Sequence, residues 1–124
     1  MKMLNKLVLL AVASLLFVAC GSSSPEAVFQ KYIDAAKVVD FKTAKECLSK
    51  SLDQEFDDMI SSIGAEEKEE LKKENANMNI RILNSEIDGD NAIVHFEEAH
   101  GDHFHKRQVS LKKEDGEWKM AEIY

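Results

Sequence analysis

The sequence is poor in positive charge. Its 124 residues include 16 lysines and arginines against 23 aspartates and glutamates, which gives a formal net charge of −7. Proteins that bind nucleic acid gain affinity by neutralising phosphates with basic side chains, and polybasic segments do the same at anionic lipid surfaces. The charge balance therefore argues against a nucleic-acid partner and against a domain that lies flat on an anionic membrane.

Motifs for catalysis are lacking as well. The chain contains no glycine-rich phosphate-binding loop, no His-Glu-x-x-His motif, and no serine, histidine and aspartate in an order that suits nucleophilic catalysis. This absence favours a non-enzymatic ligand- or protein-binding module. A small-molecule enzyme with a conical pocket is the weaker alternative.

Only one long apolar run is present. Residues 7–18 are almost wholly apolar, broken by Ser14, and Lys2 and Lys6 precede them. A helix that crosses a bilayer needs about 20 apolar residues, so this run is short and has the flanks of a secretory signal. We predict a signal peptide over residues 1–19.

Cysteine is scarce, and the first of the two marks a processing site. The segment from Leu16 to Cys20 resembles a lipobox, in which a peptidase cuts before an obligatory cysteine that carries a diacylglycerol; Phe17 stands where leucine is usual. The resemblance implies lipidation at Cys20. Residues 20–24 then form a tether that keeps the domain at 25–124 near the lipid bilayer, since four extended residues span about 14 Å.

Two further expectations follow from a lipidated Cys20. The residues after it lack the acidic run of some outer-surface lipoproteins, so we expect an outer-membrane anchor with the domain facing the periplasm. Cys47 then has no partner for an intrachain disulfide, and its place on a helical face predicts a small buried residue.

Helical patterns occupy the first half of the domain. Ser24 and Asp40 are suited to cap two helices, and Pro25 suits a first helical position. Apolar residues recur at helical spacing as Phe29, Ile33 and Ala36, as Phe41, Ala44, Cys47 and Leu48, and as Leu52, Phe56, Met59, Ile60 and Ile63. Tyr32 can reach a pocket from the first helix.

Residues 65–77 are highly charged and predict a solvated helix face or a mobile excursion.

The second half alternates like strands. Its apolar positions are Met78, Ile80 and Ile82, then Ala92, Val94 and Phe96, then Val109 and Leu111, and finally Trp118 and Met120. Glycine and aspartate turn signals separate these runs. We predict an α+β fold with the N-terminal helices packed on one face of a curved four-stranded antiparallel meander. Its core should bury Phe29, Ile33, Phe56, Val94, Phe96 and Trp118.

The order of elements resembles a family of uncharacterised small bacterial lipoproteins. The resemblance rests on residues 24–48, with their Ser-Pro-Glu start, and on the ending from Asp115 to Met120. It implies a nuclear-transport-factor-2-like, cystatin-like fold, in which a curved sheet wraps a long helix and often leaves a conical pocket. No catalytic residue is carried over.

All four histidines lie between positions 95 and 105. If Gly101 and Asp102 form a two-residue turn, His100 pairs with His103 and Glu98 with His105, and residues two apart share a face. Four side chains then gather on the core side of the hairpin tip: Glu98, His100, His103 and His105. This group predicts a zinc or copper site, with a pH-sensitive patch or a solvated tip as the alternatives.

The opposite face of the same hairpin carries His95 and several apolar residues. Ile93, Ala99 and Phe104 point outward in this register, and Glu97 lies opposite Lys106. We expect a cross-strand ion pair between Glu97 and Lys106. The apolar residues make this outer face a candidate surface for a homodimer.

Overall fold

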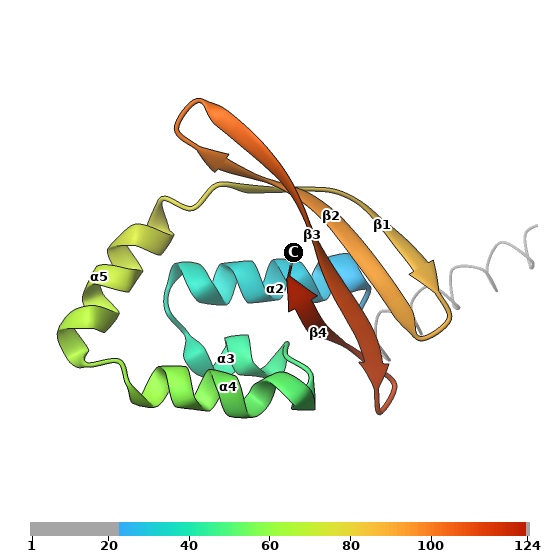
Figure 1. The fold of residues 1–124 in the computed structure, drawn as a ribbon, viewed down its shortest axis with the longest axis horizontal. Helices are drawn as coiled ribbons and strands as arrows, with labels where there is room; N and C mark the ends of the chain where they lie inside the picture. The colour runs from blue at the N-terminus through green and yellow to red at the C-terminus, as the bar shows by residue number, and fades with distance from the viewer. Residues whose placement is uncertain (1–22, 124) are drawn as a thin grey trace, which may run out of the picture.

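The computed structural model describes residues 23–123; the predicted signal peptide and Cys20 lie outside this range. The helices are α2 (Pro25–Lys37), α3 (Phe41–Glu46), α4 (Lys50–Ser61) and α5 (Ala65–Ala76). The strands are β1 (Ile80–Asp88), β2 (Asn91–His100), β3 (His103–Glu114) and β4 (Glu117–Ile123). They form one antiparallel sheet in the order β1-β2-β3-β4 (Figure 1). The predicted α+β class and the meander are confirmed.

Two predicted caps start the first helices. The Ser24 hydroxyl accepts a hydrogen bond of 3.1 Å from the backbone N–H of Ala27, and Pro25 is the first residue of α2. The Asp40 carboxylate accepts bonds from the backbone N–H of Thr43 at 3.2 Å and from its hydroxyl at 2.6 Å. These bonds hold the pKa of Asp40 below its usual value. Each cap satisfies helix N–H groups that have no partner within the helix.

The charged run folds as α5, a helix without a buried residue. Near its start the ammonium group of Lys68 lies 5.6 Å from the centre of the Phe41 ring. Near its end the Asn75 amide donates a hydrogen bond of 2.8 Å to the backbone carbonyl of Ala36. The predicted solvated helix is confirmed, and these contacts attach it to α3 and to the C-terminal end of α2.

The register of the β2–β3 hairpin is the predicted one. His100 pairs with His103 and Glu98 with His105, while Val94 pairs with Val109 nearer the base. Gly101, with φ of +63°, provides the left-handed backbone of the turn. The pairing of β1 with β2 departs from simple alternation, because the register shifts between Ile82 and Asn84.

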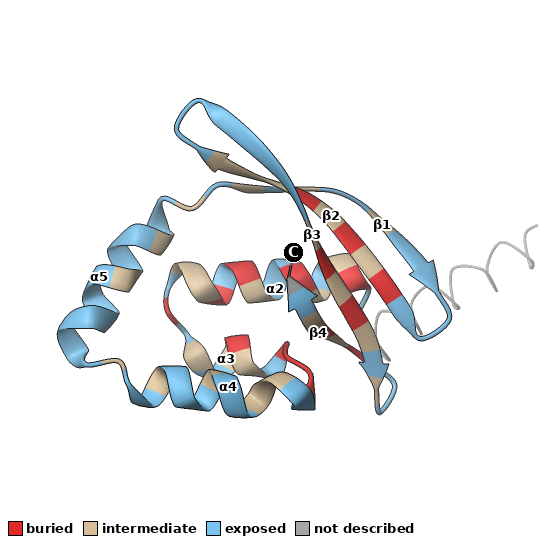
Figure 2. Ribbon diagram, in the orientation of Figure 1, coloured by how far each residue is buried: buried red, intermediate tan, exposed pale blue. Residues whose placement is uncertain are grey.

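The core lies between the sheet and the helices (Figure 2). The Phe29 and Phe96 rings meet at its centre, with 4.7 Å between their centroids. Its buried members are Phe29, Ile33, Cys47, Leu48, Ala92, Val94, Phe96, Val109, Leu111, Trp118 and Met120. The prediction that Phe56 is fully buried is wrong: Phe56 is half-buried and stacks edge-on against Phe41 at 6.2 Å. Its helix, α4, packs outside α3 and has no buried residue.

A helix needs about 20 apolar residues to cross a bilayer. Within residues 23–123, none of the helices combines the length and the apolar character that a bilayer crossing requires.

Candidate functional site

A small cavity opens where α2, the end of α5 and the sheet meet. Its volume is about 220 Å³. The apolar part of its wall is made by Phe29, Ile33, Ala36, Met78, Ile80 and Phe96, and the polar part by Tyr32, Asn75, Glu98 and Arg107. An apolar cavity with a few polar groups is the usual form of a small-molecule site.

Each wall of the cavity follows from a local structural feature. The C-terminal half of α2 presents Tyr32 and Ala36, while Phe29 and Phe96 belong to the packed core beneath. The hydrogen bond from Asn75 to Ala36 holds the end of α5 beside this half of α2. The chain then enters β1, so Met78 and Ile80 complete the apolar lining.

An ion pair forms part of the polar wall. The Arg107 guanidinium donates a hydrogen bond of 3.0 Å to Glu98 Oε2, from β3 to β2. The Glu98 side chain is 20% exposed and that of Arg107 40% exposed, so water screens the pair only in part. The two charges cancel, and the cavity can therefore receive a polar but uncharged or zwitterionic group without leaving a bare charge.

Tyr32 adds a hydroxyl to the same wall. Burial is the main cause that raises the pKa of this phenol above its usual value, and Cys47 adds to the effect. The hydroxyl is therefore protonated at neutral pH and able to donate a hydrogen bond. Asp34, two residues farther along α2 and therefore on another side of the helix, is exposed and accepts a bond of 3.0 Å from Gln30.

The predicted metal ligands are partly brought together. His100 Nε2 lies 3.6 Å from Glu98 Oε2, and the His100 and His105 rings are 5.1 Å apart at an interplanar angle of 70°. His103 lies opposite His100 in the register and is exposed. Across residues 23–123, no three histidine, cysteine, aspartate or glutamate side chains already form a group that could hold a metal ion.

The outer face of the sheet differs from one expectation. Glu97 and Lys106 are paired in register, but the Glu97 carboxylate forms its ion pair with Arg81. The expected Glu97–Lys106 bridge is wrong because β1 pairs with the other edge of β2 and places Arg81 directly opposite Glu97. Phe104 is 51% exposed there, beneath the Arg81 guanidinium at 5.1 Å. The homodimer through this face stays a prediction.

His95 lies on that outer face, as predicted. It pairs with Gln108 in the register, and its Nε2 is 3.2 Å from Glu86 Oε2 on β1. This places His95 on the opposite side of the sheet from the His100 and His105 rings.

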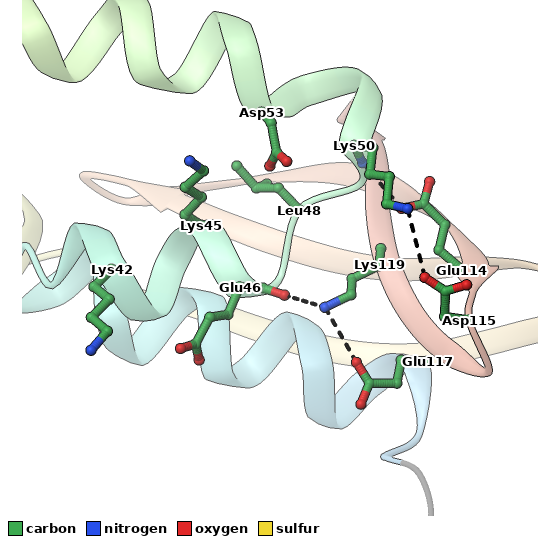
Figure 3. Close-up of a pocket in the computed structure, with 10 residues that line it drawn as sticks. All are labelled: Lys42, Lys45, Glu46, Leu48, Lys50, Asp53, Glu114, Asp115, Glu117 and Lys119. Carbon is green, nitrogen blue, oxygen red and sulfur yellow. Dashed lines mark hydrogen bonds and ion pairs between the residues drawn. The ribbon is translucent and has the colours of Figure 1, made fainter.

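A second hollow, of about 520 Å³, lies between the α3–α4 connection and the β3–β4 turn (Figure 3). Charged side chains line it and largely pair with one another. Lys119 binds the Glu46 carbonyl and lies 3.5 Å from the Glu117 carboxylate, and Lys50 Nζ lies 3.7 Å from Asp115. Because these charges satisfy each other at an open surface, the smaller cavity is the better candidate site.

Cys47 is the small buried residue that was predicted. It is 2% exposed, and its thiol lies 3.6 Å from the Thr43 carbonyl. Burial raises the pKa of the thiol. A protonated, inaccessible thiol is a poor nucleophile, so Cys47 is a packing residue.

Sequence reasoning missed two residues of the cavity. Asn75 lies in the run for which the charge pattern predicts a solvated helix face or a mobile excursion, and no role is predicted for Arg107. The signal for Asn75 was available: it is a neutral amide in a segment otherwise dominated by lysine and glutamate. The partner of Arg107 follows from the predicted register, in which Glu98 and Arg107 are diagonal neighbours on one face of the hairpin.

Comparisons with known proteins identify the fold. No family model matches the chain, and no curated protein is similar to it. The solution structure of a SEC-C motif containing protein from Rhodopseudomonas palustris is similar at a TM-score of 0.59 and 20% identity, over 82% of this chain and 77% of that one. A proposed NTF2-like transpeptidase from Campylobacter jejuni is similar at a TM-score of 0.51 and 19% identity, over 81% of this chain and 99% of that one.

These similarities bear on the fold alone. The nuclear-transport-factor-2-like (NTF2-like) fold is confirmed by the match to the Campylobacter jejuni structure. Membership of the small lipoprotein family stays a prediction.

Proposed function

We propose that the protein is a small-molecule-binding module that works while anchored to a membrane through an acylated Cys20. The observation that carries the binding role is the cavity beside α2, where four polar side chains meet an apolar wall. Such a mixture orients a ligand by its polar end and holds it by its apolar body.

Binding fits this site better than catalysis. General acid–base catalysis works best with a group whose pKa lies near the operating pH. Burial moves the pKa of Tyr32 upward, away from neutrality, and Glu98 is held in an ion pair with Arg107. The Asn75 amide is engaged with the Ala36 carbonyl. These groups are arranged to orient a ligand.

The dimensions and chemistry of the cavity define the ligand class. At about 220 Å³ it is smaller than a typical drug-sized pocket. A small amphiphile fits, with an aromatic or short aliphatic body against Phe29 and Phe96 and a polar head group at Tyr32 and Arg107. A protein segment that inserts one apolar side chain is the competing occupant.

The test uses a variant that fills the cavity. The full chain, in phosphatidylcholine nanodiscs, is titrated with the uncharged probes benzamide, indole and hexanamide by ligand-observed NMR. Ala36→Trp places a large ring in the cavity and should abolish saturable binding of any probe that the parent binds. Ala27→Trp makes the same change at an exposed position of the same helix and should leave binding unchanged. Equal effects of the two variants, or no saturable probe, would contradict the proposal.

The anchor is supported by the residues before the domain. Lys2 and Lys6, the apolar run at 7–18 and the lipobox-like segment ending in Cys20 form a lipoprotein signal in sequence. Acyl chains contribute about 0.8 kcal/mol for each buried CH₂ group, which holds a domain at a bilayer. In cells fed an alkyne fatty acid, the parent chain should be labelled and Cys20→Ser should not; labelling of both would refute the anchor.

For the location we propose the outer membrane, with the domain in the periplasm. Support comes from the Gly-Ser-rich tether, which lacks the acidic run of some surface-exposed lipoproteins. Protease added to intact cells should spare the domain, and protease added after the outer membrane is permeabilised should digest it. Digestion in intact cells would place the domain at the cell surface.

A further inference from the structure

We propose that the tip of the β2–β3 hairpin binds one divalent transition-metal ion, zinc or copper, both of which suit imidazole ligands. Glu98, His100 and His105 are the ligands, and His103 completes the set. The site shares Glu98 with the polar wall of the cavity, but its ligands His100, His103 and His105 lie outside the cavity lining, and its test does not depend on the binding of a small molecule.

The first support is the spacing of the two imidazole rings. A tetrahedral zinc ion binds imidazole nitrogens at about 2.0–2.1 Å, so two imidazoles on one ion have ring centres about 5 Å apart. The centres of the His100 and His105 rings are 5.1 Å apart. The rings are inclined at 70° and meet edge to face, so each ring has to turn about its side-chain bonds to direct a nitrogen at a shared ion.

The second support is the position of the carboxylate. Two ligand atoms on a tetrahedral ion lie about 3.3–3.5 Å from each other. The distance from Glu98 Oε2 to His100 Nε2 is 3.6 Å. His100 thus already lies at nearly the required separation from each of the other two ligands, its alternate neighbour Glu98 and its diagonal neighbour His105, while Glu98 and His105 are directly opposite in the register.

Arg107 also contacts this carboxylate and has to be taken into account. Its guanidinium donates to Glu98 Oε2 at 3.0 Å. An ionised carboxylate has two oxygens and about four lone-pair positions, so it can accept from Arg107 and bind an ion as well. A hydrogen bond of this kind orients a metal-binding carboxylate, although the positive charge of Arg107 lowers the affinity.

A small movement of side chains completes the coordination shell of the ion. The donors within residues 23–123 do not yet converge on one point. His100 is 61% exposed, and His103 and His105 are exposed as well. Exposed side chains change rotamer within nanoseconds, and directly paired residues have Cβ atoms about 4.5–5.5 Å apart. His103, opposite His100, therefore reaches the same ion by side-chain rotation alone.

The experiment is a zinc sulfate titration of the full chain without an affinity tag. The protein is held in phosphatidylcholine nanodiscs, a chromophoric chelator competes for the metal, and empty nanodiscs give the background. The parent should bind one zinc ion at micromolar concentration or below. His105→Ala should weaken binding by at least about tenfold, as losses around metal sites do. His95→Ala removes an imidazole from the same hairpin, on its other face, and should have no effect.

A second titration excludes adventitious binding to the acidic surface. Metal binding requires neutral imidazoles, whose usual pKa is about 6.5, so affinity should fall clearly between pH 7.5 and pH 5.5. The circular dichroism spectra of the variants should match that of the parent, because the altered residues are not in the core. The proposal is overturned if the parent does not bind, if His95→Ala weakens binding as much as His105→Ala, or if affinity is independent of pH.

Discussion

The base and the tip of the β2–β3 hairpin share one register and differ in almost everything else. At the base, Val94 and Val109 face each other and are 0% exposed. At the tip, every residue from 100 to 107 is exposed (Figure 2). Strand alternation decides which face a side chain takes in both halves. Whether that face is buried depends on what covers it.

Element lengths explain the difference. With 13 residues, α2 is about 20 Å long, at 1.5 Å for each residue. The 10 residues of β2 span about 33 Å, at 3.3 Å for each residue. The covering helix therefore ends before the strands do. The cavity forms at the boundary, where α2 ends and α5 partly takes its place.

The largest expected effect is at the base. Phe96→Ala removes a ring that is 3% exposed and contacts Phe29, and it should lower the free energy of unfolding by about 3–5 kcal/mol. Chemical denaturation monitored by circular dichroism measures this loss. A change below about 1 kcal/mol would mean that Phe96 behaves as a surface residue, and the contrast between base and tip would be lost.

A smaller effect is expected at the start of the helix that covers the base. Ser24→Ala removes the cap of α2 and should cost about 0.5–2 kcal/mol in the same measurement. Ser23→Ala changes the exposed neighbour and should stay within about 0.5 kcal/mol of the parent. If the two serines behave alike, the hydroxyl of Ser24 does not stabilise α2.

Alkaline pH should also lower the stability of the folded domain through its buried ionisable groups. Burial raises the pKa of the Cys47 thiol above its usual 9.0 and that of the Tyr32 phenol above its usual 10.0. The folded state therefore holds these protons more tightly than the unfolded state does. Their contribution is fully present below pH 9.0 and is lost as pH rises through the raised values. Denaturation midpoints measured from pH 7 to pH 11 should fall at the alkaline end, and less so in Tyr32→Phe.

The smallest effect belongs to the tip. His100→Ala and His105→Ala, measured without metal, should each change the free energy of unfolding by no more than about 0.5 kcal/mol, as exposed substitutions do. Zinc in excess should raise the stability of the parent more than that of His105→Ala, since a ligand that binds only the folded state stabilises it in proportion to the logarithm of its affinity. A loss above 1 kcal/mol without metal would show that the tip packs like the base.

Local rules were enough to predict much of the fold. The β2–β3 pairing followed from a two-residue turn at Gly101 and strict alternation, and the caps at Ser24 and Asp40 followed from residue type and position. These features depend on neighbours within a few residues, or on one strand pair. The prediction of which hairpin residues face the core is correct for the same reason.

Features that depend on how three or more helices and strands are arranged could not be predicted from the sequence. The shift of register between Ile82 and Asn84 has one local trace, the out-of-phase Leu83 beside Ile82, but two adjacent apolar residues do not by themselves identify a bulge. The Glu97–Arg81 pair required knowing which strand lies next to β2 on its other side. Phe56 lies on a helix, as its spacing predicts. It is only half-buried because that helix, α4, packs outside α3. The cavity itself depends on where α2 ends relative to the strands.

The direction of α2 has a consequence for how a ligand reaches the cavity. The helix begins at the tether, and the residues by which it lines the cavity, from Phe29 to Ala36, lie about 6–17 Å farther along its axis. With the proposed anchor at Cys20, this length acts as a spacer that sets the entrance away from the acyl chains. A guest molecule would then enter from the aqueous compartment, and its solubility in water, more than its partitioning into lipid, would set how often the site is filled.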